Sequence, residues 1–386
     1  MLPTQQQSTP SASGTPRLSS VTWWVLQPIT GLAFLDSYPT LARGVRIAFV
    51  SKEHIPFLVG LLEANRTRAV TFDRAAELTR VLERGAGSRV FHSFVAVSYT
   101  GRKPNPSRHD EAVSLARDVA ALLTVVLFAY SRYASAPGLS ALVSGGLDGS
   151  PDLSIPRSFL RFDGAGFGMH AILSAPIQML QGDLRQILAL PTFQCLTAIM
   201  SGERPMTPLA EAVRAATRRL AQAVHDVSLS GQILGAVTAL EILLAGESAP
   251  RGGLFPHLRY LTARLVGPVV AKQFKLWKVF DARHRYVHAG REAEKEDVAR
   301  GALILGVYAL VHAAYLAELL GDKRELERYL ETFGNPIPLT CADRVRAVGR
   351  FVTGRKSQRR DAPVLHAPDC FVLETMHRPI RLDRAP

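Results

Sequence analysis

The twenty residues from Gly301 to Leu320, GALILGVYALVHAAYLAELL, restrict the fold more than any other segment of this chain. A helix of this length and composition is long enough to cross a lipid bilayer. However, it carries His312 and Glu318, and an acidic segment (294–297) precedes it, as at the start of a helix in water. We therefore expect the buried central helix of a bundle and no membrane span.

The residues around that segment predict further helices between positions 205 and 333. Thr207 and Pro208 are a typical N-cap and first helical residue, and apolar residues follow on one face at helical spacing. Short connections then imply an antiparallel bundle. Besides the central helix, the expected helices cover about 208–224, 230–244, 256–267, 269–288 and, as a short last one, 323–333.

Residues 21–200 alternate between strand-like and helix-like patterns. GVRIAFV (44–50) and SRVFHSFVAVSYT (88–100) are rich in β-branched and aromatic residues, as strands are. DRAAELTRVLER (73–84) and the increasingly apolar segment 109–133 have the pattern of helices. We expect an N-terminal α/β-type domain of unknown role at 21–200, and an α+β fold for the chain as a whole.

The two ends of the chain have the composition of tails. Residues 1–20 are polar and rich in Pro, Ser and Thr, without the apolar core of a signal peptide, and we expect them to be disordered. Residues 334–386 are irregular, and their basic run GRKSQRR (354–360) is typical of a solvated tail. The three cysteines lack Cys-x-x-Cys spacing, which predicts neither a disulfide framework nor a zinc site and favours a reducing cytoplasm.

The charge of the chain permits a polyanionic partner. Its formal net charge is +13 and its pI about 10.0, values that suit RNA, DNA or an acidic membrane surface. Most of the 46 basic residues are arginine, and the chain is also rich in alanine and glycine. Genome composition alone produces such a bias, so the charge permits nucleic-acid binding without requiring it.

The segment ARHRYVHAG, residues 282–290, concentrates polar chemistry at the end of an expected helix. Arg283 and His288 lie about 140° apart around such a helix, so two helix ends meeting across a dimer would bring both side-chain types together. An imidazole moves protons near neutral pH, and a guanidinium binds a phosphate through two hydrogen bonds. Together they suit RNA cleavage by the 2′-hydroxyl, which needs no metal or other cofactor.

The same residues resemble a known family. Arg283, the polar His284, three intervening residues and His288 match the arginine–polar–x₃–histidine signature of HEPN domains. TALEILLAG (238–246) and FDARHRYVHAG (280–290) are similar to segments of the Apea-like branch. The resemblance covers roughly residues 205 to 333. It implies an all-α bundle that forms a homodimer and acts as an endoribonuclease in toxin–antitoxin or phage-defence systems, with Arg283 and His288 as the catalytic pair.

Other residues are expected to support this site. Glu241 shares a helical face with apolar residues, and a partly buried carboxylate requires a cation. Arg283 is the candidate, although any other arginine of the bundle would serve. The three lysines Lys272, Lys275 and Lys278 recur at intervals of three, which predicts a basic stripe along one helix leading to Arg283. Together with Arg285, they are the expected RNA-binding residues, while His284 is the polar neighbour of the catalytic pair.

Three alternatives remain open at this point. His284 and His288 have the i, i+4 spacing that can bind a metal, with a third ligand from Asp281 or from a distant part of the chain. The arginine and histidine can also be purely structural, capping the helix and filling an interface. Finally, HEPN folds also occur as non-catalytic modules that dimerise and bind RNA or protein. The RNA substrate, the trigger and any antitoxin do not follow from the sequence.

Overall fold

Most of the described chain is α-helical in a computed structural model. The structure describes residues 21–30, 32–35, 40–41, 47–51, 93–101, 105–133, 144–145, 157–162, 167–172, 177–226, 228–245, 253–293 and 295–332. The two tails expected at 1–20 and 334–386 lie outside these residues, as does the helix expected at 73–84.

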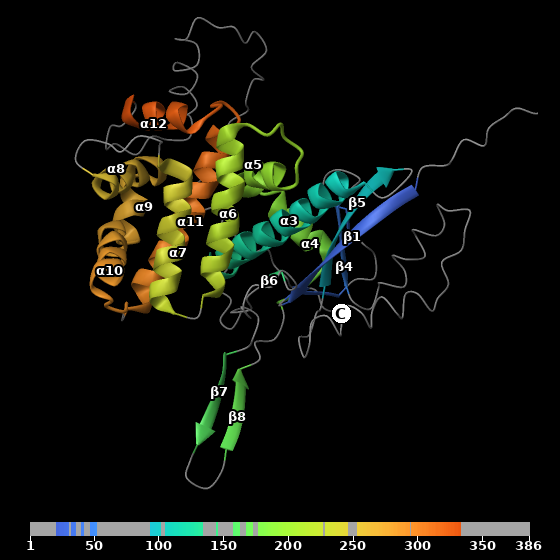
Figure 1. Cartoon of the computed structure of the whole chain (residues 1–386), viewed down its shortest axis with the longest axis horizontal. Helices are drawn as coiled ribbons and strands as arrows, with labels where there is room; N and C mark the ends of the chain where they lie inside the picture. Colours follow the sequence, from blue (N-terminus) through green and yellow to red (C-terminus); the bar gives the residue numbers. More distant parts are fainter. Residues whose placement is uncertain are drawn as a thin grey trace, which may run out of the picture.

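An antiparallel sheet lies at one side of the structure (Figure 1). Its strand order is β3-β4-β5-β1-β6, and its longest pairing aligns Val25 with Val97. Its strands are β1 (Val21–Thr30), β3 (Thr40–Leu41), β4 (Ile47–Ser51), β5 (Ser93–Gly101) and β6 (Ser144–Gly145). The strands expected from the patterns at 44–50 and 88–100 are thus confirmed as β4 and β5.

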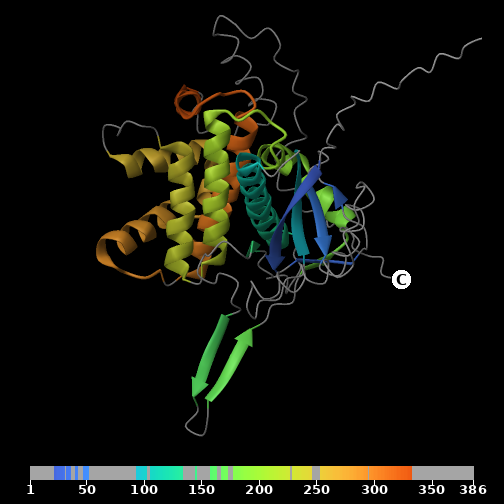
Figure 2. The same ribbon diagram turned by 45° about the vertical axis from the view of Figure 1, so that its right-hand side comes forward.

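Two smaller strand pairs complete the described β structure. Strand β2 (Leu32–Phe34) pairs in parallel with β9 (Ile177–Met179). Strands β7 (Arg157–Phe162) and β8 (Phe167–Ile172) form an antiparallel hairpin that projects away from the helices in both views (Figures 1 and 2).

Helix α3 (Pro106–Tyr133) lies between the sheet and the bundle. It packs against β1 and β5 on one side and against α6 on the other. Its buried Asp118 forms ion pairs with Arg214 and Arg218 of α6. The apolar core therefore runs without a break from the sheet through α3 into the bundle.

The chain is helical from Gln181 onward in the described residues, so the helical part begins before position 205. The helices are α4 (Gln181–Leu188), α5 (Pro191–Met200), α6 (Pro208–His225), α7 (Leu229–Leu244), α8 (Leu254–Val266), α9 (Pro268–Gln273), α10 (Leu276–Ala289), α11 (Glu296–Leu316) and α12 (Lys323–Thr332). The expected N-cap is present, because the hydroxyl of Thr207 accepts a hydrogen bond of 3.2 Å from the amide of Ala210.

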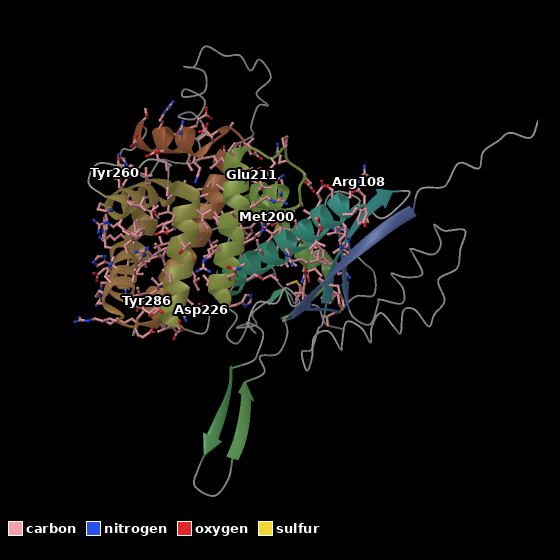
Figure 3. All side chains as sticks on the ribbon, in the orientation of Figure 1. Arg108, Met200, Glu211, Asp226, Tyr260 and Tyr286 are labelled. Atoms are coloured by element: carbon pink, nitrogen blue, oxygen red, sulfur yellow. The ribbon has the colours of Figure 1, made fainter. Side chains whose placement is uncertain are left out.

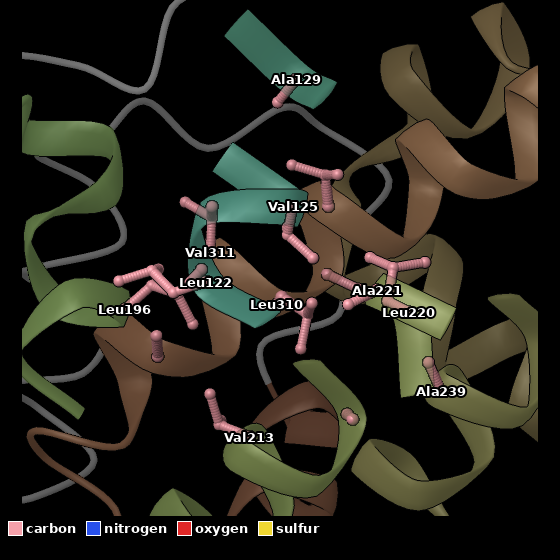
Figure 4. Packing of buried hydrophobic residues seen from close by; sticks show 14 of the residues in the cluster. Leu122, Val125, Ala129, Leu196, Val213, Leu220, Ala221, Ala239, Leu310 and Val311 are labelled. Atoms are coloured by element: carbon pink, nitrogen blue, oxygen red, sulfur yellow. The ribbon is translucent and has the colours of Figure 1, made fainter. Parts of the chain in front are cut away.

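Helix α11 is the central helix that its composition predicts. It packs against α5, α6, α7, α8 and α10, and every residue from Gly301 to Leu316 is buried. Figure 4 shows Leu310 and Val311 of α11 among side chains of α3, α5 and α6, including Leu122, Leu196 and Val213. Both α11 and α3 are long and apolar enough to cross a membrane. However, 89% of the apolar 18-residue segment of α11 and 72% of that of α3 are buried inside the protein.

The prediction of a single helix over 269–288 is wrong, because the chain forms two helices there, α9 and α10. The break lies at Lys275, whose left-handed backbone (φ 52°) begins α10. Helix α11 crosses closely at this corner: a Cβ on Gly301 would lie 2.9 Å from the carbonyl oxygen of Phe274. The turn is therefore a tertiary feature that local helical periodicity does not reveal.

Candidate functional site

Helix α10 carries the candidate site in its last two turns. It ends at Gly290, which has a left-handed backbone (φ 60°), and its amide donates to the carbonyl of Tyr286 at 3.0 Å. Glycine adopts this conformation without the penalty of a Cβ, so the helix stops there. Beyond it, the amide of Ala293 donates to the buried hydroxyl of Ser230 on α7 at 2.7 Å, which ties the segment after the helix to the bundle.

Arg283 points from α10 into the bundle and has two partners there. Its Nη2 lies 3.2 Å from Oε1 of Glu241 on α7, which confirms the pairing predicted from the sequence. Its guanidinium carbon lies 3.9 Å from the centre of the Phe255 ring on α8, a cation–π contact. Only 13% of the Arg283 side chain is exposed, so this residue joins three helices.

Burial raises the pKa of Glu241 above its ordinary value, and the positive charge of Arg283 offsets only part of that effect. The carboxylate is desolvated between two helices, where the ionised form is disfavoured. The guanidinium of Arg283, 3.2 Å away, therefore compensates the Glu241 carboxylate for only part of the hydration that it loses on burial. The Nε of Arg283 is buried without a hydrogen-bond partner among the described residues, so this pair is incompletely satisfied.

His284 and His288 lie on the outer side of the same helix. Both side chains are exposed, and their ring centroids are 4.5 Å apart. The i, i+4 spacing places the two rings over one another on one helical face. His288 is in the last helical turn. Within one chain, Arg283 thus points into the bundle and His288 points to solvent, as expected for two residues about 140° apart around the helix.

Among the described residues, no group of three metal-ligating side chains includes the histidine pair. Asp281, the candidate, forms an ion pair of 3.1 Å with Arg285. Within the described part of the chain, three metal-ligating side chains come together elsewhere, at His257, Glu327 and Glu331.

The three lysines expected to form one stripe are divided between two helices, which corrects that expectation. Lys272 belongs to α9, Lys278 to α10, and Lys275 occupies the corner between them. All three are exposed, but Lys275 bonds to Asp297 at the start of α11, and this bond lowers the pKa of Asp297. Lys275 therefore holds the corner in place, while the other two remain available for a phosphate backbone.

A basic and aromatic surface formed by α8, α9 and α10 surrounds the histidines. Between Gly253 and Ala293 the chain has eight Lys or Arg residues and two acidic ones. Exposed on it are Tyr260 and Trp277, and the Trp277 ring lies 4.1 Å from the guanidinium carbon of Arg259. Figure 3 labels Tyr260 on the upper part of this surface and Tyr286 near its lower end. Cations interleaved with exposed rings are typical of surfaces that bind single-stranded nucleic acid.

The described cysteine does not provide a nucleophile. Burial, followed by the nearby Glu318, raises the pKa of Cys195 to about 12. Its thiol is therefore protonated at neutral pH, whereas the thiolate is the form that attacks efficiently.

No protein-family model, curated protein or solved structure matches this chain. The HEPN resemblance therefore rests on the residues quoted for it.

Sequence reasoning missed two kinds of contact. The first is Phe255 beneath Arg283, which no local pattern indicates because the two residues are on different helices. The second is Asp118 with its two arginines. A signal for the latter was present, since Asp118 is an acid at the start of an almost wholly apolar run, as Glu241 is within its own helix.

Proposed function

We propose that the protein is a metal-independent endoribonuclease of HEPN type, cytoplasmic and acting in a toxin or phage-defence setting. The observation that carries this proposal is the exposed pair His284 and His288, with ring centroids 4.5 Å apart, beside a strongly basic surface. RNA supplies its own nucleophile, the 2′-hydroxyl, so the protein needs only to move protons and stabilise charge.

The expected catalytic role of Arg283 changes in this proposal. Its guanidinium is engaged with Glu241 and Phe255, so it is not free to bind a phosphate within one chain. We assign it a positioning role, fixing α10 against α7 and α8. His288 donates the proton to the leaving 5′-oxygen, His284 removes the proton from the 2′-hydroxyl, and Arg285, Lys272 and Lys278 hold the RNA backbone.

The exposed apolar residues support a homodimer through the same helices. Five of the eight exposed large apolar residues in the described part of the chain lie on α8, α9 and α10, namely Leu254, Tyr260, Val269, Trp277 and Val287. Exposed apolar residues that gather on neighbouring helices are typical of an interaction site. Two copies meeting there would place two histidine pairs at one interface. The N-terminal region, proposed as an α/β domain, would select the target.

The test is RNA cleavage by the purified full-length protein. His288→Ala should lower the cleavage rate by about 10²–10⁴-fold, as the loss of a general acid does. His109→Ala, an exposed histidine on α3, is the matched control and should cleave at the wild-type rate. An RNA with a single 2′-deoxy residue at the cleavage position should resist, EDTA should not inhibit, and products should end in a 2′,3′-cyclic phosphate.

The engagement of Arg283 favours a second candidate, a non-catalytic module that dimerises and binds RNA or protein. RNA that binds to the wild type but is cleaved by none of the preparations, or is cleaved equally by His288→Ala, would support this module instead.

A further inference from the structure

Helices α8 and α12 bring three metal-ligating side chains together, away from the candidate ribonuclease site. His257 of α8 lies with its Nε2 2.8 Å from Oε1 of Glu327 on α12. One carboxylate oxygen of Glu331 completes a group whose ligand atoms all lie within 4.8 Å of one another. Figure 1 draws α12 at the upper end of the bundle, whereas Figure 3 labels Tyr286, in the last turns of α10, near its lower end.

We propose that His257, Glu327 and Glu331 bind a divalent transition-metal ion, with Zn²⁺ as the best match, that joins α8 to α12. One imidazole and two carboxylates are a donor set that zinc accepts, and a fourth position stays open for water. Two carboxylates beside one imidazole also leave a negative charge that a divalent cation neutralises.

The helices hold these three side chains in place. Each ligand is next in sequence to a residue that is buried in the core: Leu258 follows His257, Leu326 precedes Glu327, and Leu330 precedes Glu331. Glu327 and Glu331 are four positions apart and so share one face of α12. The backbone of the site is thus fixed by packing before any ion binds, which lowers the conformational cost of binding.

The spacing requires only side-chain adjustment. With zinc–ligand bonds of about 2.0–2.2 Å, neighbouring ligand atoms of a tetrahedral site are about 3.3–3.6 Å apart. The His257–Glu327 distance of 2.8 Å must open slightly, and the exposed Glu331 must approach. Both His257 and Glu327 are partly exposed, at 20% and 28% of their side chains, so an ion can reach them from solvent.

The experiment is zinc titration of the full chain after removal of metals with EDTA and dialysis. Glu331→Gln should weaken zinc binding at least tenfold, and His257→Ala should abolish this binding. Glu211→Gln, an exposed carboxylate on α6, is the control and should leave the affinity unchanged. Because Glu331 is exposed, its variant retains the fold. Zinc at 100 times its Kd should also raise the Tm of the wild type by roughly 5 °C.

A second variant separates this site from the histidines of α10. The double change His284→Ala and His288→Ala should leave the zinc affinity unchanged. If that double variant loses zinc, or if His257→Ala and Glu331→Gln both bind zinc like the wild type, the proposal is wrong and His257–Glu327 is a simple ion pair. Neither outcome depends on whether the protein cleaves RNA.

Discussion

Glu241 and Arg283 join α7 to α10 across an interval of 42 residues, with 3.2 Å between the carboxylate and the guanidinium. Both side chains are largely buried, with 23% and 13% exposed. Each charge therefore has the other as its compensating partner, and removal of one leaves a desolvated charge behind. This relationship determines which way α10 faces, and with it which side chains of the candidate site reach solvent.

Removing the cation alone should destabilise the protein. We expect Arg283→Met to lower the free energy of unfolding by about 1.5–3 kcal/mol at pH 7, because Glu241 is left desolvated without its partner. Adding Glu241→Gln to this variant should recover most of the loss, since no charge then remains unpaired. Urea denaturation measures both values. A double variant as unstable as the single one would show that the loss comes from packing on Phe255 instead.

The raised pKa of Glu241 predicts a dependence of stability on pH. The folded state holds this proton more tightly than the unfolded state. Stability from this group is therefore present below its ordinary pKa of 4.5 and is lost as pH rises through the raised value. Urea titrations between pH 4 and 8 should show this decline in the wild type and less of it in Glu241→Gln. Equal pH slopes in the two proteins would contradict the assignment, and Glu211→Gln should keep the wild-type slope.

Close packing at Gly301 should outweigh helix propensity. Alanine is favoured over glycine in a helix by about 1 kcal/mol, yet a Cβ here would lie 2.9 Å from the Phe274 carbonyl oxygen. We expect Gly301→Ala to destabilise the protein by about 1–3 kcal/mol, a typical cost of overpacking. Gly182→Ala on α4, where a Cβ would meet nothing within 4 Å, should instead be neutral or stabilising by up to about 1 kcal/mol. Thermal unfolding of both variants decides the point.

Asp118 should couple α3 to the bundle. It is fully buried and faces Arg214 and Arg218, so Asp118→Asn leaves two arginines without their anion and should cost about 3 kcal/mol or more. A fragment of residues 205–333 lacks α3 and exposes the face of α6 that α3 covers. Thermal unfolding followed by circular dichroism should therefore show a lower Tm for this fragment than for residues 105–333. Equal Tm values would make the bundle an independent domain.

The sequence by itself determined the elements that depend on neighbouring residues. The Thr207 cap, the glycine stop at Gly290 and the buried character of α11 all follow from local residue types and periodicity. That Glu241 pairs with a cation could also be predicted, because a carboxylate within an apolar helix face requires one. These features need no knowledge of how the helices cross.

Only the tertiary structure decided the features that depend on crossing helices. The helix expected over 269–288 breaks at Lys275 where α11 packs against the corner, through Gly301 and the Lys275–Asp297 bond. The same crossings place Phe255 under Arg283, and His257 beside Glu327, 70 positions away along the chain. Periodicity gives the face on which a side chain lies, but the partner it meets depends on the angle and register at which two distant helices pack.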